Sequence, residues 1–144
     1  MTSPGVGASS ASQITDTLLE QFAGKRLMLC APVVRARKGF HKEVADALQR
    51  QGLVRARVDG KVVDLREALK AGGENPLSLG RYEVHTIEAV VDRIVPSADD
   101  RQRLAESVET ALKLGEGSCV ALVEAGNDWI EHRFSERFAC PDHP

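Results

Sequence analysis

The spacing of apolar residues along the chain predicts three helices. Apolar positions recur about every four residues, as in a helix with one buried face, over residues 12–22, 40–51 and 97–114. In the first of these, Ile14, Leu18 and Phe22 share that face. Ser97 opens the third, with Asp100 in the position of a capping box. Each helix is therefore expected to cover one side of a sheet.

Six further segments are typical of strands, and they are residues 26–34, 53–59, 61–64, 84–95, 118–124 and 132–139. The first is a nearly unbroken apolar run, which suits a central strand covered on both faces. Asp59-Gly60 is a strong signal for a tight hairpin turn. Residues 65–80 are rich in glycine and predict a loop, with room for one helical turn at residues 65–70.

The elements follow one another as a helix and then in the order βαβ-β-βαβ-β. This order predicts an α+β fold with two layers, in which about three helices pack on a mixed β-sheet. Ferredoxin-like pairing is one arrangement that fits, although the pattern does not determine the strand order. Residues 1–11 are small and polar and are expected to form a disordered leader. A single domain is expected over residues 12–139.

Composition and charge make several classes of protein less suitable as interpretations. The formal net charge is −2, whereas domains that mainly coat DNA are strongly basic. Cys30, Cys119 and Cys140 are far apart and odd in number, which indicates reduced thiols rather than a disulfide framework. No signal peptide and no apolar run of about 20 residues is present. A cytoplasmic location is therefore expected.

No catalytic motif is visible. The sequence contains no phosphate-binding loop, nucleophile elbow, zinc-protease motif or dinucleotide fingerprint. This chain is therefore not expected to be an enzyme, and a small hydrolase or metalloenzyme is the least favoured interpretation. His41 and His85 are expected to be ordinary surface or packing residues. Trp129 is expected to pack in the core or at an edge.

Two groups of basic residues are candidate binding sites. Arg55 and Arg57 fall on the opposite side of their strand from its apolar residues, and paired arginines suit carboxylates on a protein partner. Arg35, Arg37 and Lys38 lie in a basic loop before a helix, where backbone amides and the helix dipole favour a phosphate. In both cases an ordinary charged surface is the alternative.

Cys140 and His143 have the Cys-x-x-His spacing of two zinc ligands. A structural zinc site needs four ligands, and no second pair is present at such spacing. The pattern is therefore half a site, and a chance pair in a tail is the alternative.

Several segments, in order, resemble the UvrA family, the damage-recognition ATPases of the bacterial ABC excinuclease in nucleotide excision repair. These segments lie within residues 24–34, 51–60, 85–93, 102–112 and 134–141. The similarity extends from about residue 12 to residue 143. It implies that the chain is a protein-interaction domain that docks the helicase-like protein UvrB for loading onto damaged DNA. The competing interpretation is a DNA-contacting module that uses residues 35–38.

The resemblance also implies roles for individual residues. Arg55 and Arg93 become candidate contacts to acidic residues of UvrB, with Arg57 and Asp92 as weaker candidates. Cys140 and His143 match the entry to the first zinc module of the family, so residues 140–144 would be its truncated start. The full-length family binds ATP and zinc, but this chain is expected to hold neither.

Three departures from the family pattern matter. His143 stands where the family usually has cysteine, residues 66–82 form a longer loop than usual, and the nucleotide-binding motifs of the family are absent. The second departure is expected to change contacts near the binding face.

Overall fold

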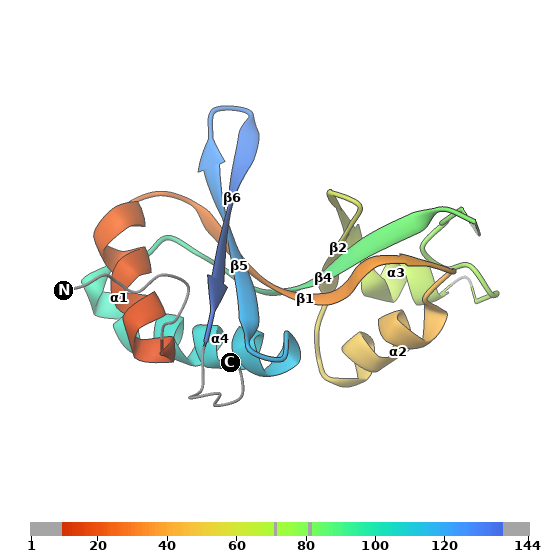
Figure 1. Cartoon of the computed structure of the whole chain (residues 1–144), viewed down its shortest axis with the longest axis horizontal. Helices are drawn as coiled ribbons and strands as arrows, with labels where there is room; N and C mark the ends of the chain where they lie inside the picture. Colours follow the sequence, from red (N-terminus) through yellow and green to blue (C-terminus); the bar gives the residue numbers. More distant parts are fainter. Residues whose placement is uncertain (1–9, 71, 81, 137–144) are drawn as a thin grey trace, which may run out of the picture. The chain divides into compact units, whose positions relative to one another are not determined.

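The computed structural model describes residues 10–70, 72–80 and 82–136. The chain divides into two compact units. Unit 1 contains residues 1–31 and 92–144, and unit 2 contains residues 32–91. Two long strands, β1 (Leu27–Lys38) and β4 (Val84–Ile94), contribute residues to both units (Figure 1). Each unit is described by itself below.

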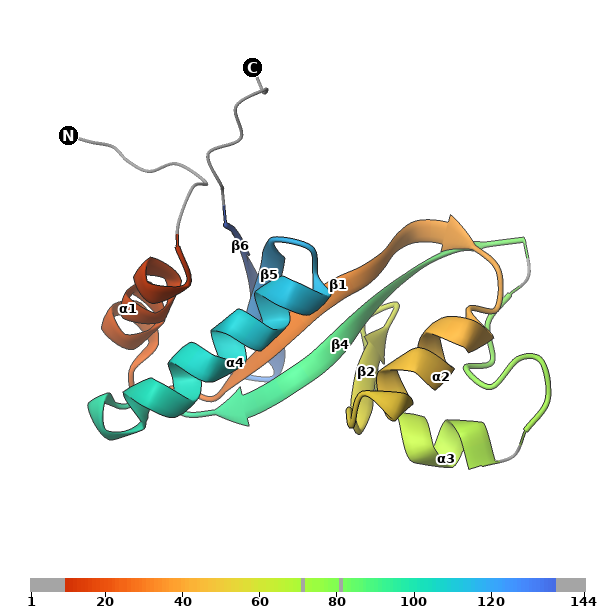
Figure 2. The same cartoon turned by 90° about the horizontal axis from the view of Figure 1, so that it is seen from below.

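Unit 1 combines a pair of packed helices with a hairpin of two strands. Its elements, besides the first part of β1 and the end of β4, are α1 (Ala11–Phe22), η1 (Ala98–Asp100), α4 (Arg101–Leu114), β5 (Ser118–Ala125) and β6 (Asp128–Ser135). Helix α1 packs against α4 (Figure 2). The residues that carry the apolar stripes, Ile14 and Leu18 in α1 and Leu104 and Val108 in α4, are completely buried. The periodicity of the sequence therefore identified the faces that form this core.

The ends of these helices show how local sequence sets their bounds. The Ser10 hydroxyl accepts the Gln13 N–H, and the Gln13 side chain accepts the Ser10 N–H, which completes a capping box at the start of α1. At the other helix, Ser97 caps the short η1 by accepting the Asp99 N–H. Helix α4 therefore begins at Arg101, four residues after the predicted cap.

Unit 2 places two short helices beside a strand hairpin. Its own elements are α2 (Lys42–Arg50), β2 (Arg55–Val58), β3 (Lys61–Asp64) and α3 (Leu65–Lys70). Asp59 and Gly60 have φ angles of 50° and 89°. A two-residue hairpin turn of this kind needs positive φ at both central positions. The predicted Asp59-Gly60 hairpin is thus confirmed.

Hydrogen bonds link the strands in the order β3-β2-β4-β1-β5-β6. The pairs β1 with β5, β2 with β3, β2 with β4 and β5 with β6 are antiparallel. The α+β class is confirmed, whereas the pairs named here are all antiparallel and include no parallel pair of the kind that the predicted mixed sheet requires. When α1, β3, α3, η1 and β6 are left out, the remaining β-α-β-β-α-β chain has the strand order β2-β4-β1-β5, which is the ferredoxin-like pairing.

The prediction of a loop over residues 35–39 is wrong for residues 35–38, because strand β1 continues to Lys38. All four side chains are exposed there, so their polarity reflects solvent contact and not an irregular backbone. Ala36 has a φ of 48°, and its N–H donates to the Thr86 hydroxyl. The strand is therefore irregular at this position, although it does not end.

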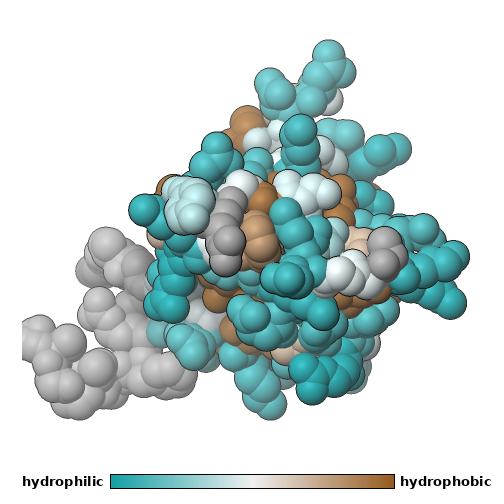
Figure 3. All heavy atoms as spheres, turned by 90° about the vertical axis from the view of Figure 1, so that its right-hand side faces the viewer, coloured by the Kyte–Doolittle hydropathy of each residue, from teal (hydrophilic) through white to brown (hydrophobic). Residues whose placement is uncertain are grey.

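No helix in the described part of the chain has both the length and the apolar character that crossing a bilayer requires. Figure 3 shows the surface of unit 2 on the side of α2 and α3. Hydrophilic side chains dominate that face, and hydrophobic ones are scattered between them.

Candidate protein-docking site

The candidate site is the side of the unit 2 sheet that lies away from α2 and α3 (Figure 1). Directly paired residues of antiparallel strands point to the same side of a sheet. The pairs on this side define a surface that we call the arginine face, and its residues are Arg55, Arg57, Val62, Asp64, Glu88 and Val90. Ala56 and Val58, which alternate with the arginines along β2, are buried on the other side.

The two arginines of this face differ in their surroundings. Arg57 Nη1 donates to Glu88 Oε1 over 2.7 Å, and the two side chains are only 21% and 7% exposed. Arg55 is exposed, and its side chain forms no hydrogen bond or ion pair with any described residue. Arg55 is therefore available to a partner, whereas the guanidinium of Arg57 is engaged inside the unit.

The other two predicted contacts lie in unit 1. Asp92 is largely enclosed, and its carboxylate accepts hydrogen bonds from Arg103 and from the Ser107 hydroxyl. Burial raises the pKa of Asp92, but these donors outweigh burial and hold the pKa below its usual value. Arg93 is exposed and lines a small pocket with Trp129. The structure thus gives Asp92 an internal role and leaves Arg93 accessible.

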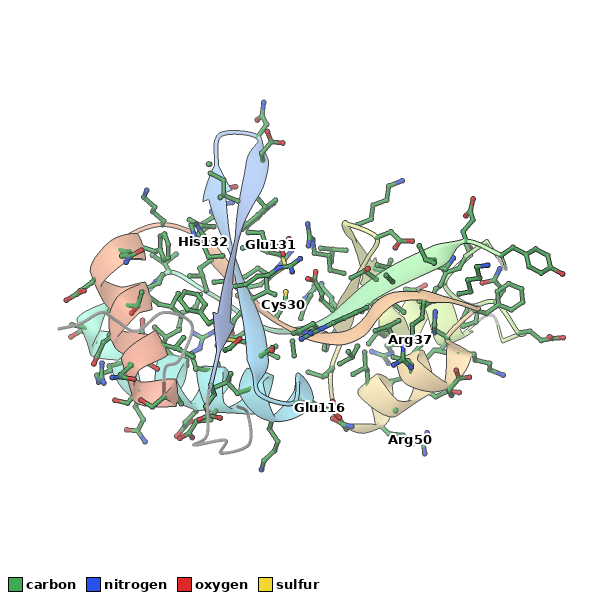
Figure 4. The ribbon with its side chains drawn as sticks, viewed as in Figure 1. Cys30, Arg37, Arg50, Glu116, Glu131 and His132 are labelled. Carbon is green, nitrogen blue, oxygen red and sulfur yellow. The ribbon has the colours of Figure 1, made fainter. Side chains whose placement is uncertain are left out.

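The basic segment lies at the end of β1 in unit 2. Arg35, Arg37 and Lys38 are exposed. Arg37 and Lys38, but not Arg35, line a hollow of about 620 Å³ together with Lys42 and Glu43 of α2. Figure 4 shows Arg37 beside α2. The hollow contains acidic as well as basic groups, so it is less suited to a phosphate than the sequence indicated.

Cys140 and His143 lie outside the described residues, so the half zinc site stays a prediction. Within the ranges that the structure covers, no cluster of three or more His, Cys, Asp or Glu residues is placed to hold a metal. Cys30 and Cys119 are buried, as predicted. Burial, and to a smaller extent the nearby Glu136, raises the pKa of Cys119 to about 12. A thiol of this kind is inert, because only the thiolate is a nucleophile.

A buried histidine that the sequence did not single out anchors the neighbouring loop. His85 Nδ1 lies 2.6 Å from Asp59 Oδ2, and Nε2 lies 2.7 Å from the Gly80 carbonyl oxygen. Both partners are acceptors, so the geometry favours the imidazolium form of the ring, in which both nitrogens donate. The other oxygen of Asp59 accepts the Thr86 N–H. The histidine therefore ties residue 80 to the β2–β3 turn.

We expect this contact to make stability depend on pH. The Gly80 carbonyl, followed by Asp59, raises the pKa of His85 above 6.5. The contribution of His85 to the free energy of unfolding is therefore complete below about pH 6.5, the pKa of an unperturbed histidine. It is lost as the pH rises through the pKa that His85 has in the folded protein. Burial raises the pKa of Asp59, but the Thr86 N–H and His85 outweigh it and lower the pKa below 3.8, so the contribution of Asp59 is lost only in acid.

Urea unfolding at increasing pH above neutrality should accordingly give a falling free energy of unfolding for the parent chain. The His85→Gln variant, which cannot titrate, should lose most of this slope. An equal slope in both proteins would contradict the assignment of the charged ring.

Comparison with known proteins places these features in a family. Residues 9–125 match the UvrA interaction domain family. The chain is 44% identical over 137 residues to UvrABC system protein A of Deinococcus radiodurans, which covers 93% of this chain and 13% of that protein. It is 50% identical over 139 residues to the protein of the same name from Pseudomonas putida, with the same coverage of 93% and 13%.

The relative from Thermus thermophilus, also a UvrABC system protein A, is 45% identical over 134 residues, again covering 93% of this chain. The chain spans about 13% of the length of these relatives. The family match covers most of the chain and includes the whole arginine face. This chain therefore belongs to the UvrA interaction domain family.

Proposed function

We propose that this domain docks UvrB, the partner that the parent ATPase loads onto damaged DNA. The observation that carries the proposal is Arg55, an exposed guanidinium without an internal partner on a sheet face away from the helices of its unit. Membership of an interaction-domain family of the UvrABC system supports a role in binding a protein of that system.

The proposed mechanism is binding without chemistry. The guanidinium of Arg55 offers a planar set of donors that matches a carboxylate in a two-pronged hydrogen bond. The neighbouring ion pair between Arg57 and Glu88 fixes the surface on which Arg55 stands. Val62, which lies on the same face and is exposed, supplies apolar area that excludes water around the charged contact. Acidic residues of UvrB would meet this face.

The remaining activities belong to the parent protein in this proposal. Damage recognition, ATP hydrolysis and zinc binding are assigned to segments outside this chain. Cys140 and His143 would supply two of the four zinc ligands only when the next part of the parent chain is present. The domain itself is proposed to be non-catalytic.

Contact with DNA is the second candidate. The observation that favours it is the run of exposed basic side chains at the end of β1, namely Arg35, Arg37 and Lys38. Phosphate contacts would make binding steeply dependent on salt, since each one releases counterions from DNA. The net charge of −2 opposes this as the main role.

Calorimetry with purified UvrB from the same organism tests the first proposal. We expect binding in a 1:1 ratio with micromolar or tighter affinity that weakens from low to high salt, because electrostatic steering contributes to association. Duplex DNA in place of UvrB should give no comparable heat. Failure to bind folded UvrB would overturn the docking proposal, and strong, salt-sensitive DNA binding would favour the second candidate.

A further inference from the structure

Unit 1 contains a pocket that the docking proposal does not use. It has a volume of about 310 Å³ and is lined by Arg26, Leu27, Arg93, Ile94, Val95 and Trp129. These residues come from the start of β1 with the residue before it, the end of β4 with the residue after it, and the start of β6. Four of the six are apolar and the other two are arginines.

The pocket has a buried floor and exposed apolar walls. Leu27 and Ile94 are almost fully buried, whereas 45% of Val95 and 39% of Trp129 remain exposed. Tryptophan and arginine are two of the residue types most enriched among the residues that dominate binding energy in protein interfaces. A volume near 300 Å³ is at the lower end of the range for sites that enclose a ligand group. The pocket is therefore suited to a single apolar side chain.

The charges at the rim indicate what accompanies that side chain. Arg26 Nε lies 3.6 Å from Glu124 Oε1, so its charge is partly matched within unit 1. The side chain of Arg93 has no acidic partner among the described residues. The adjacent Asp92 does not compensate it, because its carboxylate is engaged by Arg103. The guanidinium of Arg93 at the rim of the pocket can therefore bind a carboxylate from another molecule.

We infer that this pocket is a second anchoring point for UvrB, in which Trp129 holds an apolar side chain of the partner beside Arg93, the arginine that the resemblance already makes a candidate contact to an acidic residue. The inference rests on the proposed function and adds the chemistry of the segment that enters. The occupant is a stretch of UvrB in which a Leu-sized or aromatic residue lies beside an Asp or Glu. Trp129 thereby becomes a determinant of affinity.

Trp129 is the sole tryptophan of the chain, which allows a direct test. The chain is prepared with 5-fluorotryptophan, and its single fluorine resonance is recorded before and after addition of unlabelled UvrB. We expect the resonance to shift and broaden on binding. Calorimetry of Trp129→Ala should show UvrB affinity reduced about tenfold or more, and Arg93→Ala should lose part of the salt dependence.

Ile130→Ala is the matched control. Ile130 is 50% exposed, lies next to Trp129 in β6 and points to the other face of that strand, outside the pocket. It should bind UvrB within about twofold of the parent chain, since surface truncations outside a contact are nearly neutral. Circular dichroism and the thermal midpoint verify that each variant is folded, and the fluorine experiment needs no truncation.

The outcomes separate the two proposals. UvrB binding with an unmoved fluorine resonance, or with unchanged affinity of Trp129→Ala, would overturn the pocket and leave the docking function intact. Equal losses for Trp129→Ala and Ile130→Ala would also overturn it, because the effect would then not depend on the pocket. Absence of any UvrB binding would overturn both proposals.

Discussion

Replacing Arg57 by alanine should lower the free energy of unfolding by about 3 kcal/mol. The variant leaves the carboxylate of Glu88, which is 7% exposed, without its 2.7 Å partner. A buried charge that loses its partner costs far more than the pair itself contributes, because water cannot replace the lost hydrogen bonds. The expected loss of stability lies near the lower end of the range for broken buried ion pairs, because 21% of the Arg57 side chain is exposed. Urea unfolding at neutral pH measures it.

The double variant Arg57→Ala/Glu88→Ala is the control for this prediction. Removing both partners eliminates the orphaned charge, so the double variant should be more stable than the sum of the two single losses implies. A loss below about 1 kcal/mol for Arg57→Ala would show that the pair behaves as an ordinary surface ion pair. In that case Arg57 would again be a candidate contact to the partner.

Replacing Arg55 by glutamate should weaken UvrB binding and leave the fold intact, in contrast to the loss of stability expected for Arg57→Ala. We expect affinity to fall by at least about 30-fold, equivalent to about 2 kcal/mol, because a carboxylate then faces the acids proposed for the partner. Stability should change by no more than about 0.5 kcal/mol, as is usual for surface positions. Calorimetry with UvrB and urea unfolding of the same preparation provide the two measurements.

Arg50→Glu makes the same change of charge elsewhere in unit 2. Arg50 lies exposed in the last turn of α2 (Figure 4), and its Nε donates to the Asp46 carbonyl oxygen of the same helix. UvrB affinity should stay within a few fold of the parent chain for this control. Equal losses for Arg55→Glu and Arg50→Glu would show that only the total charge matters, and the arginine face would lose its assignment.

The parts of the fold that were predictable depend on neighbours in sequence. The helical periods, the Asp59-Gly60 turn and the alternation of Arg55 and Arg57 with buried residues all follow from local spacing. The polar end of β1 was misjudged because charged side chains on an exposed strand have the same composition as a loop. Residues 35–38 show that polarity identifies solvent contact rather than backbone conformation.

The parts of the site that were not predictable depend on residues far apart in the chain. Arg57 meets Glu88 across 31 positions, and His85 meets Asp59 across 26. Only the pairing of β2 with β4 brings these groups together. From sequence alone, Arg57 therefore resembled a free contact, and His85 resembled an ordinary histidine. Trp129 was expected in the core or at an edge, and it lies in the edge strand β6, where it lines an open pocket.

The segment between α3 and β4 has its own internal support. The Asn75 amide donates to and accepts from the backbone of Leu79, and the side chains of Leu77 and Leu79 are buried. These contacts hold the described residues 75–79 against unit 2. A spin label on Glu74→Cys, with Cys140 replaced by serine, should consequently tumble with unit 2. The buried thiols of Cys30 and Cys119 would stay unlabelled, so the spectrum of the label at residue 74 would report on unit 2 alone, before and after addition of the proposed partner.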